Sequence, residues 1–157
     1  MRAVLSSSIV SSQCTKQLTW FERVSRWLGG DRAPSLLPHG LRVYAIGDIH
    51  GRLDLLDALI ARIEDDARSG PGCQILAFVG DYIDRGYRSY DGVLRIVLRL
   101  LLAAPDHVVA MRGNHEQYMM NGDRIESSVR PAEAIASIAG RAPRALLEAH
   151  SRVFELL

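Results

Sequence analysis

The stretch VYAIGDIHGR, residues 43–52, decides the fold class, because it is an apolar run that ends in glycine, an acid and a histidine. A short β-branched and apolar run bounded by glycine is typical of a buried strand. The residues that follow, LDLLDALIARIEDDA, have the 3.6-residue spacing of an amphipathic helix, and CQILAFVG is a second apolar run. We therefore predict a strand, a helix and a strand in this part of the chain.

A second helix and a third strand continue the pattern. SYDGVLRIVLRLLLAA predicts a helix, with Ser89 or Asp91 as its N-terminal cap, and DHVVAMRG predicts the strand. Continuous apolar strands indicate parallel strands that helices cover on both faces, with right-handed crossovers. The predicted fold class is α/β, with a parallel βαβαβ arrangement.

The composition fits one folded domain and excludes several classes. Of the 157 residues, 48% are hydrophobic, and 19 basic residues stand against 18 acidic ones. The net charge of +1 gives no overall attraction to nucleic acid or to an anionic membrane, and no apolar run is long enough to cross a bilayer. Cys14 and Cys73 lack metal-type spacing, which predicts free thiols in a reducing compartment. We expect a cytoplasmic protein without nucleic-acid or membrane partners.

The chain divides at about residue 40. Residues 1–40 hold both tryptophans, a short amphipathic segment and a linker rich in Gly, Asp and Pro, and are predicted to be a poorly ordered leader. The alternative is a short helix that anchors the chain on a partner or a membrane surface. Residues 41–157 form the predicted domain, with its motifs in 47–117. The tail, 121–157, predicts two helical segments, about 131–139 and 143–157, and no strand.

Each predicted strand ends in glycine followed at once by a small oxygen-bearing side chain. The three motifs are GDIHG at 47–51, GDYIDRG at 80–86 and GNHEQ at 113–117. Ligands of an open parallel sheet bind outside the carboxyl ends of its strands, so these loops should converge on one crevice. The crevice collects Asp48, His50, Asp81, Asp84, Asn114 and His115, with Arg85 and Arg112 close by.

This set of side chains is typical of a cation site. Carboxylates and imidazoles without a thiolate suit Mn, Fe, Zn or Mg, and carboxylates gathered without a cation would repel one another. Asp81, on the middle loop, is the candidate to bridge two ions roughly 3.5 to 4 Å apart, and the guanidinium of Arg85 matches phosphate oxygens. One Asp or Asn after a strand is more often a turn or a cap. Six such residues at three strand ends favour a site.

Together the motifs resemble the metallophosphoesterase superfamily, specifically its phosphoprotein phosphatase branch, whose pattern is GDxHG, GDxxDRG and GNHE in this order. RGNHEQYMM is similar to the bacterial and bacteriophage lambda-type serine/threonine protein phosphatases. The resemblance covers residues 41–120 and implies half of a metallophosphoesterase-type sandwich. Two histidines that the family places on a second sheet have no counterpart after residue 120. We therefore expect a C-terminally truncated member that lacks the second sheet and leaves one face of the first sheet open.

The resemblance also implies a binuclear metal centre and its ligands. Asp48 and His50 hold the first ion, Asp81 bridges both, and Asn114 binds the second. Manganese is the expected metal, with Fe, Zn or Mg as alternatives. A truncated chain without the two later histidines would bind only one ion.

The catalytic roles follow from the same resemblance. His115 is the general acid that protonates the leaving oxygen, Asp84 orients it, and Arg85 binds the substrate phosphate together with Asn114. The nucleophile in this family is a metal-bound hydroxide, so no covalent phosphoenzyme forms. The implied activity is hydrolysis of phosphomonoesters, on a phosphorylated protein of the serine/threonine type or on a small phosphoester.

Two alternatives stay open. Symmetrical dinucleoside tetraphosphate hydrolases share much of the pattern, but they tend towards GNHD and lack an acid directly before the arginine. Glu116 and Asp84 favour the phosphatase. The other alternative is a non-catalytic fragment that binds one metal or a partner. The sequence leaves open the physiological substrate, the native metal and the oligomeric state.

Overall fold

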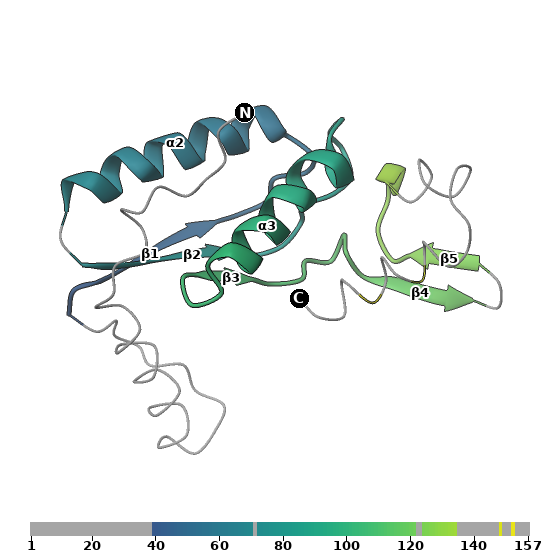
Figure 1. Cartoon of the computed structure of the whole chain (residues 1–157). Helices are drawn as coiled ribbons and strands as arrows, with labels where there is room; N and C mark the ends of the chain where they lie inside the picture. The colour runs from purple at the N-terminus through teal and green to yellow at the C-terminus, as the bar shows by residue number, and fades with distance from the viewer. Residues whose placement is uncertain (1–38, 71, 122–123, 135–147, 149–151, 153–157) are drawn as a thin grey trace, which may run out of the picture.

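The computed structural model describes residues 39–70, 72–121, 124–134, 148 and 152. The elements in chain order are β1 (Leu41–Ile46), α2 (Leu53–Ser69), β2 (Cys73–Phe78), the π-helical turn η1 (Ser89–Leu94), α3 (Arg95–Ala103), β3 (Val108–Ala110), β4 (Tyr118–Asn121) and β5 (Arg124–Ser127) (Figure 1). The alternation of strand and helix as far as β3 confirms the predicted α/β class. The predicted leader lies outside the described residues, apart from its last two.

The strands β1, β2 and β3 form one parallel sheet in that order. Val43 pairs with Ile75, and Phe78 pairs with Ala110. Both crossovers step in the same direction across the sheet, so right-handed connections place α2 and α3 on the same face (Figure 1). The carboxyl ends of all three strands meet at one edge, which brings the three motif loops together.

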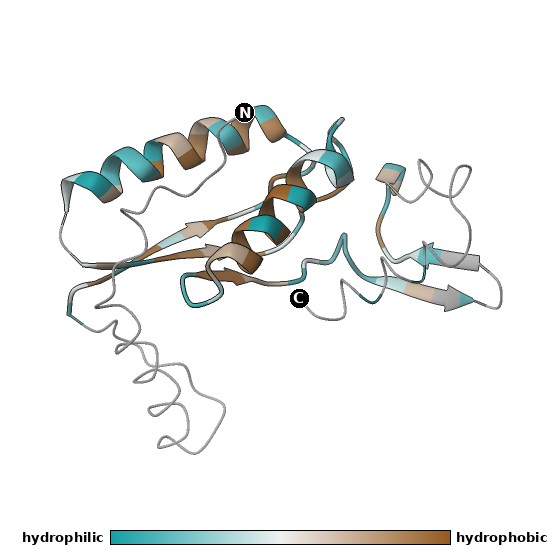
Figure 2. Ribbon diagram, in the orientation of Figure 1, coloured by the Kyte–Doolittle hydropathy of each residue, from teal (hydrophilic) through white to brown (hydrophobic). Residues whose placement is uncertain are grey.

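The hydrophobic core lies between the sheet and the two helices. Leu56 of α2, Phe78 of β2 and Val97 of α3 are at most 1% exposed, and apolar residues run along the strands and most of α3 (Figure 2). Burying each such side chain contributes about 1.5 to 3 kcal/mol. On the opposite face of β3, Val109 is 47% exposed. Among the described residues α2 and α3 cover the same face of the sheet (Figure 1), so the prediction of helix cover on both faces is wrong for this part of the chain.

The second helix begins differently from the prediction. No side chain caps η1 or α3. The carboxylate of Asp91 accepts a hydrogen bond from Arg88 Nε at 2.8 Å, and the hydroxyl of Ser89 lies 3.5 Å from the carbonyl oxygen of Gly86. Both predicted caps thus bind within the loop that leads into the helix. A π-helical turn takes the place of a capped start, a variation often found beside functional sites.

The tail contains strands, so the prediction of a purely helical tail is wrong. β4 and β5 pair antiparallel, with Tyr118 opposite Ser127 and Asn121 opposite Arg124, and lie beyond the carboxyl edge of the parallel sheet (Figure 1). Asn-Gly at 121–122 is a strong hairpin signal in the sequence. Residues 133 and 134, as well as 148 and 152, have helical backbone, and most of the two predicted helical segments lies outside the described residues.

Two further expectations concern the environment of the protein. Cys73 is buried and disulfide-bonded, so the prediction of a free thiol there is wrong, and the cysteines no longer argue for a reducing compartment. Cys14 lies outside the described residues. No helix in the described part of the chain has the length and apolar character needed to cross a bilayer. A cytoplasmic location stays a prediction.

Candidate metal centre

Backbone contacts hold the three motif loops together. The N–H groups of Ile49 and His50, in the first loop, both donate to the carbonyl oxygen of Asp81 in the middle loop, at 3.0 and 2.9 Å. The middle and third loops touch at Gly80 and Gly113, where a Cβ atom on Gly80 would collide with the Gly113 backbone. Gly80 also has a φ of +106°, which other residues rarely adopt. The glycines therefore permit the convergence that the sequence predicts.

The buried side chain of Glu116 holds the backbone of the middle loop in place. Its carboxylate is completely buried and accepts backbone N–H groups from Asp81, Tyr82, Ile83 and Gly113, at 2.8, 2.8, 3.2 and 2.9 Å. Burial raises the pKa of Glu116 above its ordinary value, and the four hydrogen bonds oppose this shift. One side chain thus satisfies four donors and sets the relative position of two loops.

The imidazole of His50 has the orientation of a metal ligand. Its Nδ1 lies 2.8 Å from the carbonyl oxygen of Ile83, so Nδ1 carries the proton and Nε2 offers a lone pair. Nε2 is buried and has no hydrogen-bond partner among the described residues. It faces Asp48 Oδ2 at 3.7 Å and Asp81 Oδ2 at 3.8 Å, too far for hydrogen bonds. These electron-pair donors surround a gap that fits a divalent cation.

The side chains of Asp81 and Asn114 extend this cluster. One end of the Asn114 amide lies 3.3 and 3.2 Å from the two Asp81 oxygens. An amide nitrogen at that position donates to the carboxylate, whereas an amide oxygen there faces only acceptors and requires a cation. One ligand atom from each of His50, Asp81 and His115 lies within 4.8 Å of the others. His115 is therefore close enough to the cation cluster to bind an ion or to act on a phosphate held there.

A second group of contacts surrounds His115. Its Nδ1 donates to Asp84 Oδ2 at 2.8 Å, and both side chains are at most 2% exposed. The other oxygen, Asp84 Oδ1, accepts the backbone N–H of Ala134 at 2.7 Å. The Nε2 atom of His115 faces the guanidinium of Arg85 at 3.3 Å. The ring is therefore fixed on one side and faces a cationic anion-binding group on the other.

Backbone strain is concentrated at the site. Four non-glycine residues have a left-handed backbone, namely His50, Asp81, Asp84 and Arg85, with φ between 48° and 65°. Each such residue costs about 1 to 2 kcal/mol and persists only where surrounding contacts enforce it. All four are among the residues that the sequence selects for chemistry, which is the distribution expected of a functional site.

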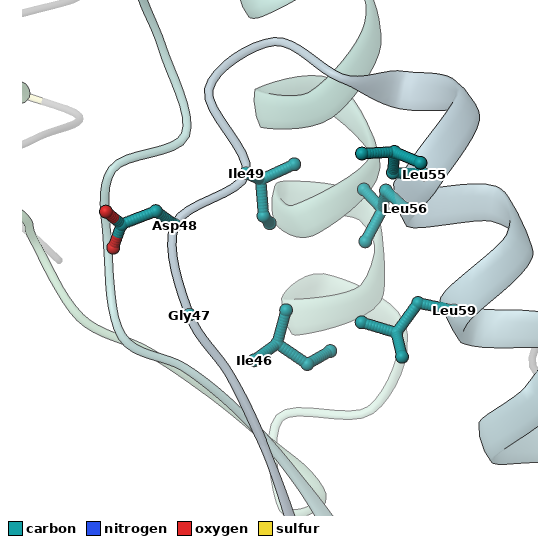
Figure 3. A pocket seen from close by; sticks show the side chains of 7 residues that line it. All are labelled: Ile46, Gly47, Asp48, Ile49, Leu55, Leu56 and Leu59. Carbon is teal, nitrogen blue, oxygen red and sulfur yellow. The ribbon is translucent and has the colours of Figure 1, made fainter.

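Asp48 is an exposed member of the cluster, with 65% of its side chain exposed. A small apolar groove of about 120 Å³ lies beside it, between the end of β1 and α2. Ile46, Ile49, Leu55, Leu56 and Leu59 line this groove. Figure 3 shows the carboxylate of Asp48 pointing away from these side chains. Asp48 therefore borders both the groove and the cation site, with its carboxylate facing His50.

The structure brings the seven predicted site residues to one edge of the sheet, and their individual roles stay predictions. Sequence reasoning used Glu116 only to choose between substrate classes and missed its structural role, although it directly follows His115 in GNHEQ. It also missed Glu133, whose carboxylate accepts the backbone N–H of Arg85 at 3.0 Å. Glu133 lies 48 residues along the chain from Arg85, outside every motif, so no local signal indicates it.

A model of one protein family, described as calcineurin-like phosphoesterase, matches residues 41–150. The match covers more than half of the chain and all three loops of the site. The chain belongs to the calcineurin-like phosphoesterases. Members of this family share the metallophosphoesterase pattern seen in the sequence, and the convergent loops agree with that membership.

Several relatives of this calcineurin-like phosphoesterase are named serine/threonine-protein phosphatases. It is 40% identical over 80 residues to serine/threonine-protein phosphatase rdgC of Drosophila melanogaster. The aligned region covers 51% of this chain and 11% of that protein. It is 37% identical over 86 residues to the serine/threonine-protein phosphatase PP2A-like PPG1 of Candida albicans, and the aligned region covers 54% of this chain and 19% of that protein. An uncharacterized Caenorhabditis elegans protein, F44B9.9, is 38% identical over 85 residues, covering 50% and 33%. The chain thus spans at most a third of these relatives.

Proposed function

We propose that this calcineurin-like phosphoesterase is a divalent-metal-dependent phosphatase that hydrolyses phosphomonoesters, of the serine/threonine phosphoprotein type. The observation that supports it most is the gap bounded by His50 Nε2, Asp48 and Asp81, directly beside His115 and its partner Asp84. The names of the relatives support the phosphoprotein class over dinucleoside tetraphosphates. We expect manganese at two sites, with Fe, Zn or Mg as alternatives.

The cation cluster would hold divalent ions that activate water and withdraw charge from the phosphoryl oxygens. Asp48, His50, Asp81 and Asn114 are the residues that would hold them. Their donor types, carboxylate, imidazole and amide, match the hard to borderline ions of the proposal. The left-handed backbone of His50 and Asp81 directs both residues to the same edge of the sheet.

The chain's own groups would bind the phosphate and deliver the proton. The guanidinium of Arg85 is exposed and presents a planar set of donors to phosphate oxygens. One of its nitrogens lies 3.3 Å from His115 Nε2. When Arg85 turns to the phosphate, Nε2 becomes free to carry a proton to the leaving oxygen. Asp84 holds the opposite nitrogen and stabilises the imidazolium form.

The test is hydrolysis of p-nitrophenyl phosphate and of a phosphoserine peptide by the purified 157-residue chain with Mn²⁺, with bound metal counted in parallel. Replacing Asp81→Asn or His115→Asn should lower the rate by about 10² to 10⁴-fold. Asp57→Asn, on the exposed surface of α2, is the matched control and should not change the rate. Turnover that does not depend on metal, or that survives both site substitutions, would contradict the proposal.

A second candidate is a chain that binds one cation without turnover. It is favoured by the single compact group of potential metal ligands found in the described part of the chain, which contains His50, Asp81 and His115. One bound Mn²⁺ per chain, together with no hydrolysis above that of Asp81→Asn, would support this candidate. Two bound ions with hydrolysis would support the phosphatase.

A further inference from the structure

The segment that follows the β4–β5 hairpin returns to the middle motif loop. Glu133 Oε2 accepts the backbone N–H of Arg85 at 3.0 Å, and the backbone N–H of Ala134 donates to Asp84 Oδ1 at 2.7 Å. Two neighbouring residues of the tail thus bind two neighbouring residues of the loop. Ala134 is 4% exposed and packs in the hydrophobic core, which fixes this end of the segment.

The two loop residues need such support. Asp84 and Arg85 both have left-handed backbone, with φ of 65° and 59°. Two consecutive strained residues would relax unless contacts on both sides hold them. Asp84 Oδ2 is held by His115, and the N–H of Arg85 is held by Glu133. The conformation that presents the Arg85 guanidinium therefore depends on an acceptor outside the motifs.

We propose that Glu133 is a positioning residue, which holds the backbone of Arg85 so that its guanidinium is directed to the substrate phosphate. This inference rests on the proposed phosphatase function. The carboxylate of Glu133 accepts the backbone N–H of Arg85. The backbone N–H of Ala134 donates to Asp84, which in turn binds His115. The tail, which carries none of the family motifs, thus completes the phosphate-binding part of the site.

The first experiment compares two substitutions in the full chain with Mn²⁺ present. Glu133→Ala removes the acceptor, and we expect the Kd for inorganic phosphate and the KM for p-nitrophenyl phosphate to rise by roughly three- to tenfold, with kcat within about twofold. Glu133→Gln keeps an acceptor oxygen and should restore most of the affinity. Glu126→Ala, on the exposed surface of β5, removes a carboxylate that binds Asn121 and is the matched control.

The second experiment is a double-mutant cycle with Arg85→Ala. If Glu133 acts through Arg85, Glu133→Ala should weaken phosphate binding no further in the Arg85→Ala background. Additive losses, equal losses for Glu133→Ala and Glu133→Gln, or a fall in melting temperature without a change in phosphate Kd would overturn the inference. Phosphate binding that responds to Glu133 in a chain without turnover would support it while contradicting the proposed function. A chain that neither binds phosphate nor hydrolyses it would overturn both.

Discussion

The two halves of the site are built in opposite ways. The acid half, which comprises His115, Asp84 and Arg85, is closed by direct hydrogen bonds of 2.7 to 3.3 Å. The cation half, which comprises Asp48, His50, Asp81 and Asn114, leaves acceptors facing one another, with His50 Nε2 3.7 and 3.8 Å from two carboxylate oxygens. In the acid half, the polypeptide itself supplies the hydrogen-bond partners. In the cation half, a bound ion would offset the repulsion between the acceptors that face one another.

This difference indicates that folding and metal binding are separable in this protein. Glu116, the close contact of Gly80 with Gly113, and Glu133 hold the loops through contacts within the polypeptide, so we expect the chain to fold first and to bind metal afterwards. The metal then adds stability in proportion to its concentration instead of creating the fold.

The largest effect is expected at Glu116, which supports both halves. Glu116→Ala would leave four backbone N–H groups without their acceptor and should lower the free energy of unfolding by about 3 kcal/mol or more. Urea denaturation of the metal-free protein measures this loss. Glu116→Gln would place an amide N–H₂ group against backbone donors and should also lower the free energy of unfolding.

The control for this prediction is Glu64→Gln, at a half-buried position of α2 whose carboxylate has no hydrogen bond to another described residue. It should change the free energy of unfolding by less than about 0.5 kcal/mol. A Glu116→Gln variant as stable as the parent would mean that the buried carboxyl is already neutral, and would contradict its role as a fourfold acceptor.

Metal addition separates the halves. At a Mn²⁺ concentration of about 100 times the Kd, the folded protein should gain about 2.7 kcal/mol, which a thermal melt detects as a higher Tm. Asp81→Asn should remove this gain because Asp81 faces His50 and adjoins Asn114. His115→Asn should keep it. If His115→Asn also loses the Mn²⁺-dependent rise, His115 belongs to the cation half instead of the acid half.

A comparison of two loop glycines, Gly113 and Gly47, tests how closely the middle and third loops approach each other. A Cβ atom at Gly113 would collide with Asp81 Oδ1, whereas a Cβ atom at Gly47 would meet nothing within 4 Å. Gly113→Ala should therefore cost about 1 to 3 kcal/mol of stability and weaken Mn²⁺ binding, and Gly47→Ala should do neither. Calorimetric titration with Mn²⁺ together with denaturant melts would detect the contrast. Equal behaviour of the two variants would contradict the close approach of the loops.

The smallest effect is expected outside both halves, at the start of α2. Hydrogen bonds from Arg52 lower the pKa of Asp54 from 3.8 to about 2. Because the folded-state pKa is lowered, Asp54 stabilises the protein above pH 3.8, and this contribution is lost as the pH falls towards 2. The stability difference between the parent and Asp54→Asn should shrink across that range, modestly because the pair is exposed.

Asp57→Asn, which removes a carboxylate without a hydrogen-bond partner among the described residues, serves as the control. A stability difference between the parent and Asp54→Asn that grows as the pH falls would contradict the assigned direction of the pKa shift.

Local sequence patterns were sufficient for the parallel half of the fold and for placing the predicted site residues at one edge of the sheet, while the roles of these residues stay predictions. Period and composition reveal β1, α2 and β2, because strand and helix repeats are properties of short segments. The Gly-Asp and Gly-Asn endings place polar ligands at one sheet edge, because parallel strands share that edge. The caps at Ser89 and Asp91 failed because a neighbouring loop bound both side chains.

The support of the site could be seen only in three dimensions. Nothing near Arg85 in sequence indicates Glu133, and nothing near Asp81 indicates that Glu116 holds its backbone, because both contacts close loops of more than 30 residues. Likewise, the gap between His50 Nε2 and the carboxylates of Asp48 and Asp81 exists only once the first and middle loops are packed together. By itself, the amino-acid sequence determined which groups can do chemistry, since this depends on residue type and local spacing. Tertiary packing decided which of them face one another and what holds them there, since that depends on partners far along the chain.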